Sequence, residues 1–311
     1  MFSSDQWAVV LGGSSGFGLA TAQRLGEQGM SLCIVHRDRR AAMKAIEPEF
    51  EKIRSNGTKL VTFNADALDA DKRNEVLDQL APELGGGKVR VLLHSVAFGN
   101  LKLLVPDTLR PRTATSKLAS KLGIDESKLQ GALDEIFEEG DPQAQAMAEA
   151  PVYSDKHFLD EDDFLRTIHA MGTSLLGWVQ QIHSRGLFQS DARVFGLTSE
   201  GNEVAWKGYA AVSAAKVSLE SLSRSIALEF APHGIRSNII QAGVTETPAL
   251  AAIPGSNHIK AGARLRNPFG RLTTPQDVAK VIALLSTDDA SWINGELIRV
   301  DGGEHISGVT S

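Results

Sequence analysis

Short apolar runs alternate with longer amphipathic stretches along most of the chain. Several of these runs are apolar at nearly every position, which is typical of strands in a parallel sheet that is covered on both faces. The runs that fit this description are residues 7–13, 31–37, 59–66, 89–97, 192–199, 235–243 and 296–303. Helical patterns separate them, so the sequence predicts one doubly wound α/β domain over residues 1–311, with a parallel sheet of about seven strands flanked by helices.

The start of one helix is specified residue by residue. Thr274 stands at a cap position, Pro275 follows at the first helical position, and Asp277 falls in the first turn. These residue types favour a helix N-terminus, where the first amide groups have no partner within the helix. Threonine and aspartate oxygens accept hydrogen bonds from such amides, and proline has no amide hydrogen to satisfy. The sequence therefore predicts a helix that begins at Pro275.

One long stretch, residues 101–160, interrupts the alternation and contains no strand pattern. Within it, apolar side chains recur at helical spacing on one face, with acidic residues opposite. The apolar positions are Leu129, Leu133, Ile136 and Phe137. We expect a helical insertion after the fourth strand that packs its apolar stripe on the body of the protein. The alternative is a lid over the active site.

Composition and charge narrow the class of protein. Hydrophobic residues make up 42% and charged residues 23%, which is ordinary for a globular protein with a sizeable core. The net charge of −6 argues against a nucleic-acid binder. The single cysteine, Cys33, lies in an apolar run and excludes an intrachain disulfide. No apolar run reaches membrane-spanning length and no signal-peptide pattern is present, so we expect a cytoplasmic enzyme.

A glycine-rich turn joins the first predicted strand to the following helix. Its glycines have the spacing G-x3-G-x-G, and the turn consists of Gly12, Ser14, Ser15, Gly16, Phe17 and Gly18 with Gly13. Glycines let the backbone approach a pyrophosphate, and the helix N-terminus supplies amide donors and a positive dipole. Because the turn lies between a strand and a helix, a dinucleotide site is favoured over a tight turn without a ligand.

This arrangement resembles the short-chain dehydrogenase/reductase family over nearly the whole chain outside residues 101–160. In that family an acidic residue at the end of the second strand binds the adenosine ribose of NAD. His36 takes that place here, and Arg37 follows it. The loss of a carboxylate and the gain of a guanidinium favour a 2′-phosphate, and therefore NADP(H) as cofactor. The alternative is that Arg37 belongs to an ordinary solvated charged face.

The resemblance also implies further contacts with the cofactor. Asp66 matches the family's adenine contact, Thr247 matches the threonine that contacts the carboxamide, and Gly243 follows Ala242 where the family usually has Pro-Gly. Ser95, Val96 and Ala97 stand where the family usually has Asn-Asn-Ala-Gly. This replacement resembles the enoyl reductases of the family. Together the implied contacts are Asp66, Ala67, Ser95, Val96, Ala97, Lys216, Gly243, Thr245 and Thr247.

Tyr209 and Lys216 lie on what is predicted to be one helix, with six residues between them. The family usually places only three residues between its catalytic tyrosine and lysine. A spacing of seven positions keeps both side chains near one face but moves the phenol one turn, about 5 Å, along the axis. The usual position of the phenol is occupied by Val212, which can transfer no proton.

The displaced phenol favours one reaction over another. In carbonyl reduction the hydride reaches the carbon bonded to the oxygen, about 1.2 Å away. In reduction of an enoyl thioester the hydride reaches Cβ, and charge collects on an oxygen further away, where a stabilising donor has to stand. Tyr-x6-Lys is also typical of the family's enoyl-acyl-carrier-protein reductases. The resemblance thus implies an NADPH-dependent enoyl thioester reductase. A ketone or aldehyde reductase of the same fold, or a non-catalytic NADP-binding regulator, are the alternatives.

The resemblance assigns roles to the catalytic residues. Lys216 would bind the nicotinamide ribose and, as a cation, lower the pKa of the phenol. Tyr209 would stabilise the enolate, and Ser199, at the end of the fifth strand, would assist or else only cap a turn. His169 lies near the position of the family's active-site asparagine, although a helical histidine is more often a packing or surface residue.

The stretch after Thr247 corresponds to the family's variable substrate loop. Its first half is apolar, which suits an acyl chain. Its second half carries Lys260, Arg264, Arg266 and Arg271. Such a cluster suits an acidic acyl carrier protein or the phosphates of coenzyme A, but it is equally compatible with ordinary solvated charge. The resemblance further implies a homo-oligomer, a tetramer or a dimer.

Overall fold

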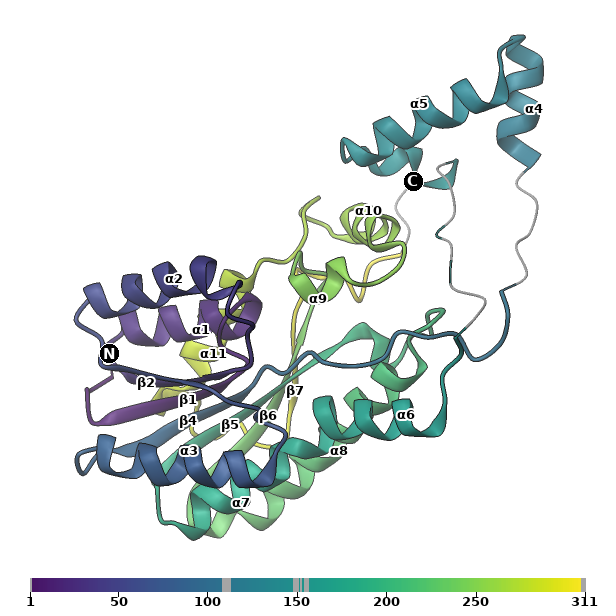
Figure 1. Cartoon of the computed structure of the whole chain (residues 1–311). Coiled ribbons are helices and arrows are strands. Elements are labelled where there is room, and N and C mark those ends of the chain that lie inside the picture. Colours follow the sequence, from purple (N-terminus) through teal and green to yellow (C-terminus); the bar gives the residue numbers. More distant parts are fainter. Residues whose placement is uncertain (1, 108–112, 148–150, 152, 154–156, 309–311) are drawn as a thin grey trace.

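A seven-stranded parallel sheet forms the centre of the protein (Figure 1). The computed structural model describes residues 2–107, 113–147, 151, 153 and 157–308. The strand order is β3-β2-β1-β4-β5-β6-β7. The strands are β1 (Gln6–Leu11), β2 (Ser31–His36), β3 (Leu60–Asn64), β4 (Lys88–His94), β5 (Phe188–Ser199), β6 (Ile235–Ala242) and β7 (Leu297–Val300). The predicted doubly wound sheet is therefore confirmed.

The predicted strands differ from the observed ones mainly at their carboxyl ends. Residues 12–13, 95–97 and 301–303 were expected to continue strands, but they lie in the loops that follow. The apolar character of 95–97 is not that of a strand core, because these residues line a cavity instead. At the other end, β5 begins at Phe188, four residues before the predicted start.

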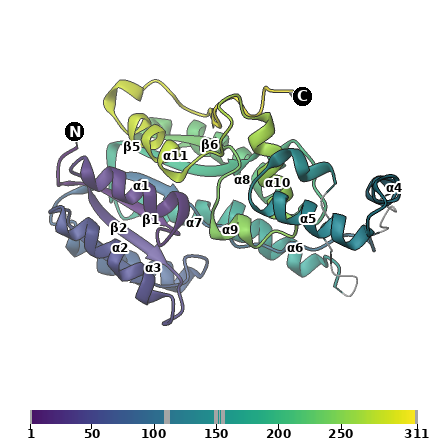
Figure 2. The ribbon, with the colours of Figure 1, turned by 90° about the horizontal axis from the view of Figure 1, so that it is seen from above.

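Helices cover both faces of the sheet (Figures 1 and 2). One face carries α1 (Gly16–Glu27), α2 (Met43–Ser55) and α11 (Pro275–Leu285), and the other carries α3 (Ala70–Glu83), α7 (Ser174–Ser184) and α8 (Ala210–Glu229). In β1 the neighbouring residues Val9 and Val10 are both fully buried, one in each of the two cores. Burial on both sides explains why the strands are apolar at successive positions.

Helix α11 begins as the sequence predicts. Thr274 Oγ1 accepts a hydrogen bond from the amide of Asp277 at 3.2 Å, and the Asp277 carboxylate accepts one from the amide of Thr274 at 2.9 Å. This reciprocal pair satisfies amide groups at the helix start that have no partner within the helix. Pro275 occupies the first turn.

The segment after β4 is helical, and its first two helices stand away from the sheet, beyond α10 (Figures 1 and 2). Its elements are α4 (Thr113–Leu122), α5 (Glu126–Glu138), a 3-10 turn (Pro142–Ala146), α6 (Glu161–Ile168) and a π-helical turn (His169–Thr173) that leads into α7. The remaining elements are α9 (Pro248–Ala251), α10 (Ser256–Arg266) and short 3-10 turns at Glu200–Asn202, Ala231–His233 and Asp288–Ala290.

The apolar stripe on α5 is fully buried only at Phe137, among its four described positions. Phe137 is buried in a cluster with Ala261 of α10, and its ring centroid lies 4.5 Å from that of His258. Leu133 is half-buried, and Ile136 is 43% exposed. The expectation that the whole stripe packs on the body is therefore wrong, because Ile136 is exposed and, among the described residues, the buried contact with α10 is made by Phe137 near the C-terminal end of α5.

Among the described residues, no helix combines the length and the apolar character that crossing a bilayer requires.

Candidate functional site

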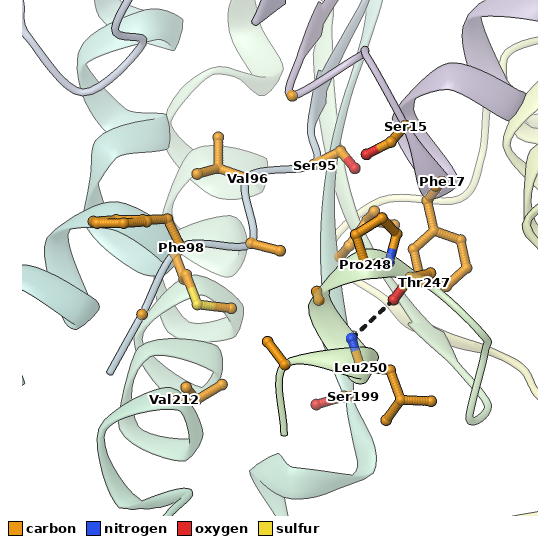
Figure 3. Close-up of a pocket in the computed structure, with 18 of the residues that line it drawn as sticks. Ser15, Phe17, Ser95, Val96, Phe98, Ser199, Val212, Thr247, Pro248 and Leu250 are labelled. Carbon is orange, nitrogen blue, oxygen red and sulfur yellow. Dashed lines mark hydrogen bonds between the residues drawn. The ribbon is translucent and has the colours of Figure 1, made fainter. Parts of the chain in front are cut away.

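The carboxyl ends of the central strands open into one cavity of about 630 Å³ (Figure 3). In an open parallel sheet, ligands bind at this edge where the strand order reverses. Here the reversal lies between β1 and β4. The cavity is lined by every site residue that the sequence predicts except Gly18 and the less favoured His169.

The glycine turn after β1 forms one end of the cavity. Gly12 has φ of 80°, and a Cβ added to it would lie 2.5 Å from Ser95 O. A Cβ on Gly18 would lie 2.3 Å from Gly12 O, so Gly18 lets α1 pack against the turn and does not face the cavity. Ser15 is the N-cap of α1, but its side chain makes no capping hydrogen bond. The amides of the first turn are thus left without a side-chain cap, as an anion site requires.

Arg37 follows β2, lines the cavity and already has a partner. Its Nη1 donates to Asp66 Oδ2 at 2.6 Å, and its guanidinium lies 4.7 Å from the centre of the Phe98 ring. His36 is buried, and its Nδ1 lies 2.9 Å from Asp38 Oδ2. The sequence assigns Arg37 and Asp66 to different parts of the cofactor, whereas the structure pairs them with each other.

Tyr209 and Ser199 bring two hydroxyl groups together at the other end of the cavity. Tyr209 is the N-cap residue of α8, so it precedes the helix on which the sequence placed it. Its Oη lies 3.3 Å from the Oγ of Ser199, the last residue of β5. Burial raises the pKa of Tyr209, and the hydrogen bond with Ser199 opposes this only in part. The phenol therefore keeps its proton at neutral pH and can donate a hydrogen bond.

Lys216 lies on α8 and is buried, and its Nζ donates to Leu197 O at 2.8 Å. Burial lowers the pKa of Lys216 to about 8, against a smaller opposing effect of Glu220. The expectation that Lys216 lowers the pKa of Tyr209 is wrong for this structure. The ammonium group is directed at a β5 carbonyl, and burial determines the pKa of the phenol.

Val212 forms part of the cavity wall (Figure 3) and follows Tyr209 by one turn along α8. Its neighbours are apolar, and a cluster of buried residues joins it to Met171 and Tyr209. The Trp206 ring lies edge-on to that of Tyr209, with 5.3 Å between the centroids. Further apolar residues on this side are Leu101, Leu250, Ile253 and Ile259. This half of the cavity can hold an apolar group next to the two hydroxyls.

The loop after β6 closes the cavity opposite α8. Thr247 caps α9, since its Oγ1 accepts from the amide of Leu250 at 3.2 Å, as Figure 3 shows. Thr245 Oγ1 donates to Gly243 O at 2.9 Å. Both hydroxyls therefore have partners within the chain.

The basic residues of the substrate loop are largely engaged inside the chain. Lys260 lies 3.2 Å from Glu246, Arg266 pairs with Glu200, and Arg271 lies 2.7 Å from Asp277. This pairing weakens the case for a free basic surface. His169 is exposed and does not line the cavity, and its Nε2 lies 3.3 Å from Leu68 O, which fits the packing or surface role.

Two carboxylates next to the site were not singled out from the sequence. Glu200 follows Ser199 directly and lines the cavity, and Glu304 is buried behind it. The adjacency of Glu200 to Ser199 is a signal in the sequence. The burial of Glu304, just after the last strand, has no such signal.

Comparison with known families agrees with this geometry. Residues 6–108 match the family described as "short chain dehydrogenase", and residues 128–305, more than half of the chain, match the one described as "Enoyl-(Acyl carrier protein) reductase". The chain belongs to the short-chain dehydrogenase/reductase family. This is a family of oxidoreductases, as the resemblance in the sequence implied.

Individual relatives within the family differ in their reactions. The chain is 27% identical over 306 residues, 96% of each protein, to cis-4-hydroxycyclohexanecarboxylate dehydrogenase of Sinomonas cyclohexanicum. It is 38% identical over 113 residues to enoyl-[acyl-carrier-protein] reductase [NADH] FabI of Aquifex aeolicus, covering 36% of this chain and 42% of that protein. Its fold is similar to the crystal structure of enoyl-(acyl-carrier-protein) reductase from Anaplasma phagocytophilum in complex with NAD. That comparison has a TM-score of 0.69 and 20% identity, and covers 98% of this chain and 94% of the other.

Proposed function

We propose that this short-chain dehydrogenase/reductase uses NADPH to reduce the C=C bond of an enoyl thioester. The observation that carries the proposal is the position of the phenol. Tyr209 stands before the first residue of α8, while the cavity wall one turn later is formed by Val212, where the family usually has its tyrosine. A donor displaced in this way stands where charge collects in an enolate, beyond the carbon that accepts hydride.

The residues of the cavity fit a dinucleotide. The glycine turn and the uncapped start of α1 would hold the pyrophosphate. Asp66, Ala67 and the 95–97 loop would line the adenine and nicotinamide sides. Arg37 would bind the 2′-phosphate. Its guanidinium would then either leave Asp66, its present partner, or contact Asp66 and the phosphate together. When bound, NADPH would supply the hydride to Cβ, and one proton taken up at Cα would convert the enolate to the saturated thioester.

Tyr209 would donate its hydroxyl proton in a hydrogen bond to the thioester oxygen. Because burial raises the pKa of the phenol, the proton stays on Oη until charge develops on the substrate. Ser199 Oγ, 3.3 Å away, orients the phenol and offers a second donor to the same oxygen. A donor that is already in place stabilises the enolate without reorganisation.

Lys216 would bind the ribose hydroxyls with its ammonium group. Its pKa of about 8 leaves it mostly protonated at neutral pH, and its hydrogen bond to Leu197 O fixes the side chain beside β5. Thr245 and Thr247 would contact the carboxamide from the loop after β6.

The acyl chain would lie against the apolar wall that includes Met171, Trp206 and Ile253. Three of the four basic residues of the substrate loop have carboxylate partners within the chain. The proposal therefore specifies an acyl thioester as substrate but not its carrier. An acyl carrier protein and coenzyme A are the two carriers to compare.

A second candidate is an NADPH-dependent ketone or aldehyde reductase. It is favoured by the approach of the Ser199 and Tyr209 hydroxyls, which could together polarise one carbonyl oxygen. One relative that matches over nearly its whole length is named a cis-4-hydroxycyclohexanecarboxylate dehydrogenase. Consumption of NADPH with a crotonyl thioester and with an acetoacetyl thioester distinguishes the two reactions.

A further inference from the structure

A single buried carboxylate, that of Glu304, joins both ends of the substrate segment, which we define as residues 244–266. Glu304 Oε2 accepts from the amide of Val244, the first residue of the segment, at 3.2 Å. Glu304 Oε1 accepts from Nη2 of Arg266, the last residue of α10, at 3.0 Å. The segment therefore leaves β6 and returns to within reach of one side chain that follows β7.

Arg266 also ties this junction to the catalytic strand. Its Nη1 and Nη2 lie 2.5 and 2.7 Å from the two carboxylate oxygens of Glu200, in a bidentate pair. Glu200 follows Ser199, so one guanidinium bridges the end of the substrate segment and the residue beside the catalytic hydroxyl. The side chains of Glu200 and Glu304 are only 11% and 3% exposed. Bidentate pairs shielded from solvent fix geometry more firmly than surface pairs do.

The substrate segment supplies one wall of the cavity. Leu250, Ile253 and Ile259 line it from α9, the following turn and α10. These three side chains take no part in the contacts of Glu200 and Glu304, which instead hold the two ends of the segment through Val244 and Arg266. The Glu200–Arg266–Glu304 network thus ties both ends of the segment to the residues around β5 and after β7.

We propose that Arg266 and Glu304 are positioning residues that hold the substrate segment closed against the catalytic strand and so set the affinity for the acyl group. That the network holds the segment closed is argued from its hydrogen bonds and does not depend on the reaction. The effect of closure on acyl binding rests on the proposed function.

The network also links closure to pH. Burial raises the pKa of Glu304 to about 7, with Arg266 of α10 opposing and Glu200 and Asp301 adding to the rise. Opening the segment would expose Glu304 and return its pKa toward the ordinary value of 4.5. The closed form thus binds a proton more tightly, and protonation favours closure. We expect the hold on the segment to weaken as pH rises through about 7.

The first test needs no substrate. Hydrogen–deuterium exchange of peptides from residues 248–262 would be compared in wild type, Arg266→Gln and Arg271→Gln. Arg271 lies beyond the segment and pairs with Asp277 at the surface. Arg271→Gln is therefore the control, because it also removes one guanidinium but leaves the network intact. We expect faster exchange of these peptides in Arg266→Gln alone, by about tenfold, as for loss of a shielded ion pair. Unchanged exchange in a folded Arg266→Gln protein would overturn the proposal.

The second test uses whichever thioester the enzyme turns over. Arg266→Gln should raise the KM for that thioester about tenfold and leave the Kd for NADPH, from fluorescence titration, within about twofold. In wild type the KM should rise at least about threefold from pH 6 to 8, whereas in Glu304→Gln, whose amide cannot ionise, the KM should not change with pH across that range. Equal pH dependence in wild type and Glu304→Gln would refute the role of Glu304. A preference for the keto thioester would contradict the proposed reaction and leave the anchoring intact.

Discussion

The Oη of Tyr209 lies 3.3 Å from the Oγ of Ser199, although the two residues come from the start of a helix and the end of a strand. The phenol sits one turn before its usual family position, and this pairing brings it next to Ser199, the second donor in the proposed reaction. The position where the family usually has its tyrosine is occupied by Val212, which lies in an apolar cluster. This relationship underlies the proposed choice of C=C over C=O.

Replacing Tyr209 with phenylalanine should remove the main donor to the thioester oxygen. We expect turnover of a crotonyl thioester to fall by about 10²–10³, the usual effect of losing one donor of this kind. The Kd for NADPH should stay nearly unchanged. Steady-state kinetics and fluorescence titration measure the two quantities.

The other tyrosine of the chain, Tyr153, provides the control. It lies beside Gly208, and a Cβ on that glycine would be 3.4 Å from the Tyr153 ring. Tyr153→Phe removes the same hydroxyl group from a residue outside the cavity lining and should leave turnover within about threefold of wild type. Full activity of Tyr209→Phe would contradict the assigned role.

Arg37→Ala should discriminate between the two nicotinamide cofactors. Losing one charge-assisted contact with the 2′-phosphate should weaken NADPH binding by about 1.5–3 kcal/mol, and NADH binding should hardly change. Arg39→Ala, an exposed residue of the same basic run that does not line the cavity, is the control. Equal effects of Arg37→Ala on both cofactors would show that the guanidinium serves only its pair with Asp66.

Asp191→Asn should destabilise the fold without touching the cavity. Arg90 and Arg193, each only 1% exposed, both place Nη1 2.6 Å from the Asp191 carboxylate. Removing its charge takes away the carboxylate that buried Arg193 pairs with and leaves Arg90 with the exposed Asp288, and we expect a loss of about 3 kcal/mol or more in urea unfolding. Asp288→Asn removes a 91% exposed partner of Arg90 and should cost at most about 1 kcal/mol. Similar losses in both variants would disprove this account.

The same carboxylate gives a pH dependence of definite sign. Burial alone would raise the pKa of Asp191, but the hydrogen bonds and charges of Arg193 and Arg90 outweigh it and lower the pKa. A lowered folded-state pKa stabilises the protein above the unfolded pKa, near 4, and this contribution is lost as pH falls below it. Between neutral pH and pH 3, wild type should therefore lose more stability than Asp191→Asn.

Phe137→Ala should release α5 from α10, because Phe137 is the buried residue of the stripe on α5. Limited proteolysis within residues 113–147 should accelerate, while Ile136→Ala, at a 43% exposed position, should behave as wild type. No described residue of 113–147 lines the main cavity, so neither variant should alter the Kd for NADPH. Identical cleavage of the two variants would mean that the contact with α10 does not hold the insertion.

The sheet and the dinucleotide end could be predicted because their signals are local. Strands buried on both faces are apolar at successive residues, and the glycine turn is complete within residues 12–18. The ends of the strands were predicted less accurately. Ser95 and Val96 are small or apolar like strand residues, but they line the cavity and do not continue β4.

The electrostatic connections of the site could not be predicted in the same way. Arg37 and Asp66 are 29 positions apart, and Arg266 is 66 positions from Glu200 and 38 from Glu304. Such pairs depend on how the strands and loops meet in space, and no periodicity in the sequence specifies them. The same limit applies to the pKa of Tyr209, which burial decides and which a motif of two residues cannot show.

The most direct test of the account is the specificity of the wild-type enzyme with NADPH in excess. The rate of NADPH consumption would be measured with a crotonyl thioester and with an acetoacetyl thioester on the same carrier, over a range of concentrations. A displaced phenol that serves an enolate predicts a kcat/KM at least about tenfold higher for the crotonyl thioester, equal to about 1.4 kcal/mol of transition-state stabilisation. A higher kcat/KM for the acetoacetyl thioester would contradict the account and assign Tyr209 and Ser199 to carbonyl reduction.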